Sequence, residues 1–366
     1  MIFLTLIASL LVAVTSWAAP VFERDLTVPA SPLQVYNALT VDWQVRQWSG
    51  AKVVVSDATP GGAWRWEFFP GQFGFGGQFE VVERPERLVF SHQVFGFYSQ
   101  VTLEIEPRGD SSRIHFVHTV PEDSNEPFDF RGRVKTFLDH VASRLPSYLS
   151  CSPGGYLARP TGASPFPAVL LLHDRFGVNR TMRAFCDSLA AGGYVAQAAD
   201  MFRGEVTADL GQAERFASLV KMEEAQEAAR RAFRCLHQDL RVDSNRMAVW
   251  GLGFGTAAAL RLAAEEPYLR GVVLWQGATL PEPEALRRVA APVFALFADT
   301  DISQPRAEIT AFSQQLVQAG VRVETVILSG NREFSDPAYG VGYTASVVGE
   351  GWPRTLLFLD KQLRPR

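Results

Sequence analysis

The amino-acid sequence predicts two domains of different fold class, an α+β domain followed by a doubly wound, mostly parallel α/β domain. Between about residues 51 and 120, apolar residues recur at every second position, and a long amphipathic helix pattern follows. After about residue 156, short continuous apolar runs alternate with helical patterns, as in a parallel sheet covered by helices. The length of 366 residues also suits two domains.

Composition narrows the function classes. The chain is 47% hydrophobic and 20% charged, with a formal net charge of −4 and no basic block, so nucleic acid is not an expected partner. The three cysteines, Cys151, Cys186 and Cys235, lie far apart and form no C-x-x-C pair. This spacing argues against a structural zinc site and against a disulfide framework. We therefore expect no metal site.

The N-terminus predicts export. Residues 1–14 are almost wholly apolar, and Ser16-Trp17-Ala18-Ala19 supplies small residues around a cleavage point before Pro20. We interpret residues 1–19 as a signal peptide and expect an exported protein, periplasmic or secreted, with no membrane span after cleavage. An uncleaved anchor is the alternative.

The first domain is predicted to cover residues 20–149. Val21 to Val28 has a strand pattern, and Ser31-Pro32 begins a helix with Ser31 as its N-cap. Trp64, Trp66 and Phe68 alternate with charged residues, as in a strand with one buried face. Further strand patterns cover residues 78–83, 88–95, 101–106 and 113–120, and helical spacing follows from residue 134 to 148.

Two histidines lie on the apolar faces of these strands. His92 alternates with apolar residues on one strand and His118 on another. Each is either a core histidine with a satisfied hydrogen bond or a polar contact inside an apolar pocket. His115 and His118 point to opposite faces, so they do not form a metal site. Residues 70–79 form either a flexible lip or a loop whose Phe side chains pack inward.

The first domain resembles the START-like helix-grip superfamily, in the branch of the heat-shock-ATPase-activator homologues. The resemblance rests on "VPASPLQVYNALT", "GGAWRWEF", "VVERPERLVFSH" and "VTLEIEPRGDSSRIHFVHT". It implies a cavity between sheet and helix that binds an apolar small molecule.

The second domain is predicted to cover residues 156–366, after a linker at 150–155. Ala168 to His173 is a continuous apolar run, typical of a buried parallel strand. Further strand patterns cover residues 194–198, 247–250, 271–275, 293–297 and 323–328. Helical patterns between them include residues 181–191 and 223–240.

This domain resembles the dienelactone hydrolase family of α/β-hydrolases. The matching segments are "YLARPTGASPFPAVLLLHDRFGVN", "MRAFCDSLAAGGYVAQAADMFRG", "RVDSNRMAVWGLGFG", "PVFALFADTDISQP" and "GWPRTLLFLDKQL". Similar members use a Cys or Ser nucleophile, then Asp, then His, and they cleave cyclic enol-lactones and related esters. The nucleophile stands on a sharp strand-to-helix turn called the elbow.

The resemblance implies a dismantled catalytic triad. The nucleophile position falls on Gly253, the acid position on Asp301, and the histidine position on Arg332 in "SGNREF". The last histidine of the chain is His237, so no histidine follows Asp301. Glycine supplies no nucleophile, and arginine stays protonated and cannot act as a base. Loss of the central triad members typically lowers turnover roughly a million-fold.

Other parts of the family's active site are expected to be present around the elbow. The backbone N–H groups of Arg175 and Phe254 are candidate oxyanion donors, and Asp174 stands where the family usually has Glu. Together with Arg332, the side chain of Arg175 would suit an anionic ligand. Alternatively, Asp174, Asp301 and Arg332 pair with one another and only stabilise the strand ends.

The leading hypothesis is an exported protein that binds an apolar or anionic small molecule without turnover. The rival is an active ester or lactone hydrolase with an unconventional nucleophile, to which the first domain presents substrate. Cys186 and Cys235 read as small buried hydrophobes, and Ser303 and Ser329 lack a histidine partner. A structural role is a third possibility. No dinucleotide cofactor is expected, because Thr256 and Gln276 break that fingerprint.

Overall fold

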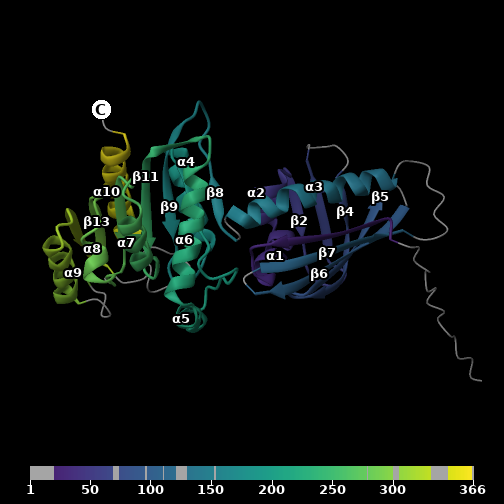
Figure 1. Cartoon of the computed structure of the whole chain (residues 1–366), viewed down its shortest axis with the longest axis horizontal. Coiled ribbons are helices and arrows are strands. Elements are labelled where there is room, and N and C mark those ends of the chain that lie inside the picture. Colours follow the sequence, from purple (N-terminus) through teal and green to yellow (C-terminus); the bar gives the residue numbers. More distant parts are fainter. Residues whose placement is uncertain are drawn as a thin grey trace, which may run out of the picture.

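A computed structural model of the chain describes residues 20–68, 74–94, 97–109, 111–120, 130–151, 154–277, 279–299, 305–330 and 345–364. The two predicted domains lie side by side, each built around its own sheet (Figure 1). The signal-peptide interpretation concerns residues 1–19, which lie outside the described residues.

The first domain contains strands β1 to β7 and helices α1 to α3. The strands are β1 (Phe22–Val28), β2 (Val53–Ser56), β3 (Ala63–Glu67), β4 (Phe75–Glu83), β5 (Arg87–Val94), β6 (Phe97–Arg108) and β7 (Ser111–Thr119). The helices are α1 (Pro32–Thr40), α2 (Asp42–Ser49) and α3 (Phe130–Cys151). Ser31 caps α1 as predicted, in a reciprocal capping box with Gln34. The short helix α2 was not predicted.

All seven strands form one antiparallel sheet in the order β1-β7-β6-β5-β4-β3-β2. Helix α3 lies across the sheet (Figure 1). Aromatic side chains fill the space between them: Phe137 of α3 stacks on Phe75, with ring centroids 4.6 Å apart, and contacts Trp66 at 5.2 Å. Phe75 and Phe79 pack inward, as one interpretation of residues 70–79 predicts, but both belong to strand β4 rather than to a loop. Residues 69–73 lie outside the described residues.

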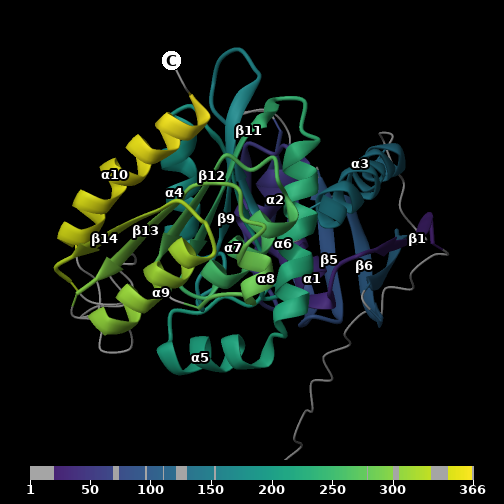
Figure 2. The same ribbon diagram turned by 60° about the vertical axis from the view of Figure 1, so that its left-hand side comes forward.

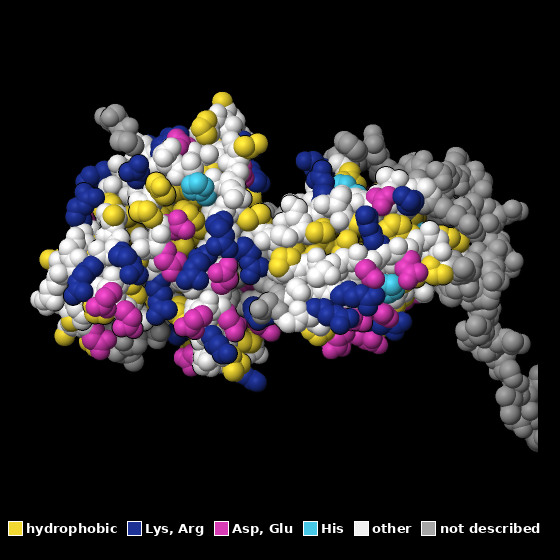
Figure 3. Space-filling model, viewed as in Figure 1, with side chains coloured by type: hydrophobic (Ala, Val, Ile, Leu, Met, Phe, Trp, Pro, Cys, Tyr) yellow, Lys and Arg dark blue, Asp and Glu magenta, His cyan; other side chains and the backbone are white. Residues whose placement is uncertain are grey.

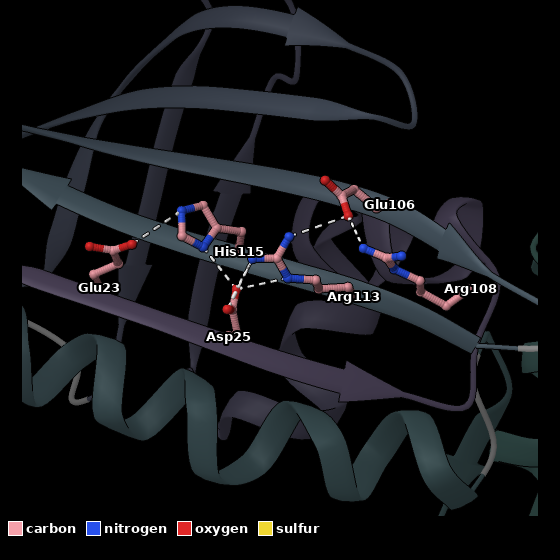
Figure 4. A network of polar contacts seen from close by, with 6 residues as sticks. All are labelled: Glu23, Asp25, Glu106, Arg108, Arg113 and His115. Atoms are coloured by element: carbon pink, nitrogen blue, oxygen red, sulfur yellow. Dashed lines mark hydrogen bonds and ion pairs between the residues drawn. The ribbon is translucent and has the colours of Figure 1, made fainter.

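The outer face of this sheet carries a network of charges (Figure 4). The guanidinium of Arg113 on β7 donates two hydrogen bonds to Asp25 on β1, at 3.1 and 3.0 Å. His115 Nδ1 lies 2.8 Å from the same carboxylate. The bond from Arg113, and then that from His115, hold the pKa of Asp25 below its usual value. His115 thus faces away from buried His118, as the alternation predicts.

The second domain contains strands β8 to β14 and helices α4 to α10. The strands are β8 (Tyr156–Ala158), β9 (Phe166–Leu172), β10 (Val195–Ala199), β11 (Val242–Leu252), β12 (Gly271–Trp275), β13 (Val293–Ala298) and β14 (Val323–Leu328). The helices are α4 (Arg180–Ala191), α5 (Leu210–Leu219), α6 (Met222–His237), α7 (Gly255–Glu265), α8 (Pro283–Leu286), α9 (Arg306–Gln318) and α10 (Ala345–Leu363).

The second sheet has the order β14-β13-β12-β11-β9-β10-β8 and is parallel except for edge strand β8. Helices α4 and α10 cover one face, and α6 to α9 cover the other (Figure 2). This is the predicted doubly wound arrangement. The central strands are apolar on both faces because helices bury both sides of them.

A disulfide and several polar contacts join the two domains, at the narrowing visible in Figure 3. Cys151, the last residue of α3, is bonded to Cys235 of α6, with a Cα–Cα distance of 5.6 Å. The side-chain amide of Gln47 in α2 pairs with the backbone N–H and C=O of Leu157 in β8, each at 3.0 Å. The first domain therefore covers the open edge of the second sheet.

The cysteine prediction was wrong in this respect. Cys235 is not a buried apolar residue but half of an inter-domain disulfide, whereas Cys186 is free and fully buried as expected. The two bonded residues are 84 positions apart and belong to different domains, so no local pattern could show that they meet. The predicted linker is also shorter, because α3 continues to Cys151.

Candidate functional site

The turn between β11 and α7 has the backbone geometry of a tight elbow. Gly253 has a φ of +49°, in the left-handed region. Its N–H donates to the carbonyl of Trp275 at 2.8 Å. Its carbonyl accepts hydrogen bonds from the N–H of Thr256 at 3.2 Å and from the Thr256 hydroxyl at 2.7 Å. The turn is thus held by the neighbouring strand and by the first turn of α7.

The three glycines of the elbow serve different purposes. A Cβ on Gly251 would lie 2.6 Å from the carbonyl oxygen of Gly255, and a Cβ on Gly255 would lie 2.3 Å from that of Leu172. No side chain fits at either position. A Cβ on Gly253 would lie 3.2 Å from the Cβ of Asp174, a tight contact, and 3.8 Å from the Cα of Asp174 and the carbonyl oxygen of Gln276. Glycine at 253 therefore satisfies the φ angle, whereas the other two are required by close backbone contacts.

Asp174 and Arg175 follow β9, and Asp174 lies beside the elbow. Asp174 is only 7% exposed, and its Oδ1 accepts the N–H of Phe176 at 2.9 Å. The guanidinium of Arg175 lies over the Phe176 ring, 5.3 Å from its centroid, and 3.9 Å from the carboxylate of Glu214 on α5. The structure thus brings together Asp174 and the elbow, which are far apart in the sequence.

Phe254 is the N-cap residue of α7, so the N-terminus of a helix directly follows Gly253. The N–H groups of a first helical turn have no acceptor within the helix, and the helix dipole is positive at this end. Such an end favours a negatively charged or developing oxyanion group. The ring of Phe254 packs edge-on against Phe202, 5.1 Å away between centroids.

Gln276 borders the same site and was not predicted as part of it. It follows β12, is buried, and has a φ of +59°, unusual for a residue other than glycine. Its carbonyl oxygen lies 3.8 Å from the position of a Cβ on Gly253. The sequence shows no signal of this conformation, because glutamine is not a residue that favours it.

His173 is the histidine that immediately precedes Asp174, and its ring is fully engaged. Nε2 accepts the N–H of Met201 at 2.9 Å, so Nδ1 carries the proton and donates to the carbonyl of Asp174 at 2.6 Å. Burial lowers the pKa of His173 to about 4, which keeps the ring neutral at pH 7. This ring has no lone pair left to act as a base at the elbow.

The remaining residues of the predicted triad are Asp301 and Arg332, and both lie outside the described residues, as does Ser303. Ser329 is exposed in the segment after β14. Cys186 is a buried residue of α4 that faces the core, and burial raises the pKa of its thiol far above the usual range. A thiol held in its neutral form is a poor nucleophile.

The two histidines of the first domain lie in its core rather than at the elbow. His92 and His118 are 2% and 0% exposed. Burial, together with the neighbouring His118, lowers the pKa of His92 to about 4. The ring of His92 lies 5.4 Å from that of Phe75 and 6.0 Å from that of Trp64.

The cavity between the first sheet and α3 is small. Among the described residues it has a volume of about 30 Å³, enough for about one or two water molecules. Its lining residues are Leu39, Trp64, Trp66, Phe79, Leu88, Phe90, Leu103, Phe116, Phe137, Leu138 and Val141. Small-molecule pockets usually measure about 300–1,000 Å³. In this conformation aromatic side chains occupy the space expected for an apolar ligand.

The described part of the chain contains no group of three His, Cys, Asp or Glu side chains arranged to hold a metal ion. Within the same residues, none of the helices combines the length and apolar character required to cross a membrane.

Comparison with known proteins agrees with this architecture. Residues 154–363 match the model of the dienelactone hydrolase family, and residues 29–149 match that of the activator of Hsp90 ATPase homolog 1-like protein. A protein of Yersinia pestis named "Putative carboxymethylenebutenolidase" is 26% identical over 215 residues, which cover 55% of this chain and 80% of that protein.

A second relative, from Bradyrhizobium, is named "Probable 2-oxo-3-(5-oxofuran-2-ylidene)propanoate lactonase". It is 25% identical over 217 residues, covering 56% of this chain and 87% of that protein. The solved structure of m3DLH is 26% identical, with a TM-score of 0.52, and covers 57% of this chain and 92% of its own. The family match spans more than half of the sequence. This chain therefore belongs to the dienelactone hydrolase family, and an activator-homologue domain precedes its hydrolase fold.

Proposed function

We propose that this chain is a non-hydrolytic member of its family, which binds a small carboxylate-bearing lactone at the β11–α7 elbow without opening the ring. One observation carries the proposal. Gly251 and Gly255 keep the close backbone contacts of the elbow, while Gly253 has the left-handed backbone of that turn and no side chain to attack a carbonyl.

The chemistry of acyl transfer supports the absence of turnover. A lactonase of this type needs a nucleophile, a base within hydrogen-bond reach of it, and an acid that orients the base. Gly253 offers none of these groups. Arg332, at the family's histidine position, stays protonated, and both ring nitrogens of His173 are already bonded. Asp301 alone cannot replace the missing groups.

The names of two relatives suggest the class of ligand. Carboxymethylenebutenolide and 2-oxo-3-(5-oxofuran-2-ylidene)propanoate both contain an unsaturated five-membered lactone with an exocyclic double bond and a carboxylate. The N-terminus of α7 favours an anion of this kind near the elbow. Arg175 directly follows Asp174 in the chain, and its guanidinium is proposed to pair with the carboxylate of the ligand. A lactone carbonyl at the elbow would accept the N–H groups of Phe254 and Arg175.

The proposal includes export. The apolar segment at residues 1–14 favours it. The disulfide between Cys151 and Cys235 also supports it, because structural disulfides persist mainly in oxidising compartments outside the cytosol.

Titration calorimetry with carboxymethylenebutenolide tests the proposal, because it measures binding without requiring a reaction. We expect saturation near one lactone per chain, and mass spectrometry of the released ligand should recover it intact after hours. Arg175→Gln should weaken binding, whereas Arg108→Gln, at an exposed charge on the far domain, should leave it unchanged. Ring opening in proportion to protein concentration would establish the hydrolase alternative instead, and the absence of any binding heat would reject the elbow as a lactone site.

A further inference from the structure

A short segment after β10 joins the two domains. Residues 200–204 leave the carboxyl edge of the second sheet and lead toward α5. Two consecutive residues in it are left-handed: Arg203 has a φ of +57° and Gly204 a φ of +101°. This conformation is unfavourable for arginine, so the surrounding contacts must stabilise it.

The carboxylate of Asp200 provides one of those contacts, because it accepts the N–H of Phe202 at 2.9 Å, and helix α1 of the first domain provides three more. The hydroxyl of Ser31 donates to the carbonyl of Arg203, and the side-chain amide of Asn37 donates to the carbonyl of Gly204, both at 2.9 Å. Between them, Gln34 Nε2 donates to Asp200 Oδ2 at 2.9 Å. The three donors are spaced three residues apart, on one face of the helix start, and all three are buried.

The opposite side of the segment contacts the elbow site. Phe202 packs against Phe254, with ring centroids 5.1 Å apart. The N–H of Met201 donates to His173, whose other nitrogen holds the carbonyl of Asp174. Slightly further on, the N–H of Thr207 donates to the carbonyl of Phe176 at 3.2 Å. Residues 200–204 therefore contact α1 on one side. On the other side they contact Phe254 after the elbow and, through His173, the backbone of Asp174.

The segment packs closely on α1 at one point and adjoins a cavity at another. A Cβ on Gly204 would lie 3.2 Å from the Cγ of Leu33 and 3.1 Å from the side-chain nitrogen of Asn37. Beside it lies a cavity of about 300 Å³, lined by Ser31, Gln34, Asp200 and Arg203 together with residues of α6. Where this cavity adjoins the segment, the side-chain hydrogen bonds from α1 are the contacts that join residues 200 and 203 to the first domain. The disulfide and the Gln47–Leu157 pair keep α1 at a fixed distance from the second sheet.

We infer that Ser31, Gln34 and Asn37 of the first domain are positioning residues for the elbow site of the second domain. They hold residues 200–204 in the conformation that places Phe254 and Asp174, and they thereby set the affinity of the elbow site for its ligand. The part of this inference that concerns affinity rests on the proposed lactone binding. Under this account the first domain acts on the ligand site through α1, not through its own small cavity.

The test uses the full chain with Asn37→Leu, which keeps the size of the side chain but removes the donor. Thr40→Val is the matched control, because the Thr40 hydroxyl is also buried in α1 but donates within the same helix, to the carbonyl of Tyr36. Amide hydrogen exchange, read by mass spectrometry, and calorimetric affinity for carboxymethylenebutenolide are measured on both variants. If Asn37→Leu does not fold, Asn37→Ala makes the same test.

We expect Asn37→Leu to speed exchange about tenfold at residues 200–207 and 254–256 and to weaken lactone affinity about tenfold, as loss of a hydrogen bond of ordinary strength would. Thr40→Val should change neither. Unchanged exchange in residues 200–207, or faster exchange there with unchanged affinity, would overturn the inference. If the wild type binds no lactone, the proposed function fails separately, and exchange at residues 254–256 alone then decides whether α1 positions the elbow.

Discussion

The elbow and the domain junction are held by different kinds of contact. At the elbow, glycines and backbone atoms determine the shape, and Gly253 at the turn carries no side chain. At the junction, side chains from distant parts of the chain meet: Gln34 and Asp200 are 166 positions apart. The two regions thus differ in what fixes their shape: backbone contacts shape the elbow, and side-chain contacts attach the second domain to the first. Under the proposed function, this combination serves binding rather than turnover.

Breaking the disulfide should have the largest effect on stability. The double variant Cys151→Ser/Cys235→Ser should lower the free energy of unfolding by about 2–5 kcal/mol, because the bond closes a long loop between domains. Denaturant titration should then resolve two transitions, one for each domain. Wild-type protein treated with a dithiol reductant should match the double variant; a reductant with no effect on the wild type would show that the bond does not support the junction.

Alanine substitutions of the elbow glycines should differ clearly in their effect on the free energy of unfolding. Gly255→Ala should lower the free energy of unfolding by about 3 kcal/mol or more, because its Cβ would collide with the backbone of Leu172. Gly253→Ala should lower it by only about 1 kcal/mol, the usual penalty of a left-handed alanine. Equal losses of unfolding free energy in the two variants, measured by thermal or denaturant unfolding, would mean that the turn cannot accommodate a side chain at position 253.

Asp200 should make the junction sensitive to pH. Burial raises the pKa of this carboxyl from 3.8 to about 6, although hydrogen bonds from Gln34 and from backbone N–H groups oppose the shift. The folded state therefore holds the proton more tightly than the unfolded state. The contribution of Asp200 to stability should rise by about 2 kcal/mol as pH falls from about 7 to about 4, and it is fully present only below the unfolded pKa.

Two variants isolate this contribution in denaturant titrations at several pH values. Asp200→Asn should remove the rise in stability, whatever it does to the absolute value. The exposed Asp25 should act with the opposite sign, because its lowered pKa gives stability that is lost as pH falls. An Asp200→Asn profile parallel to the wild type would contradict the assignment of the titration to the junction.

Local patterns predicted most of the fold. Strand alternation placed His92 and His118 in the core and His115 outside, and the S-P signal placed the start of α1. The elbow glycines and the alternating second domain were visible for the same reason, since each depends on neighbours along the chain.

The junction could not be predicted in this way. The polar face of α1 resembles a solvated helix face until the second domain covers it. The left-handed conformations of Arg203 and Gln276 arise from tertiary contacts, and neither residue type favours them. The pairing of Cys151 with Cys235 likewise depends on how two separately folded domains meet.

The double variant Gly253→Cys/Arg332→His shows whether the proposed non-hydrolytic site differs from a hydrolase only in its side chains. It places a cysteine at the family's nucleophile position and a histidine at its base position, and Asp301 already stands at the acid position. The measurement is the loss of lactone absorbance with carboxymethylenebutenolide, for the double variant, both single variants and the wild type. If only side chains distinguish the elbow from a hydrolase site, the double variant alone should open the lactone ring slowly, since the triad acts as a unit. A folded double variant that binds the lactone but leaves it intact, with a thiol of ordinary reactivity, would contradict the claim that only side chains were lost from the site.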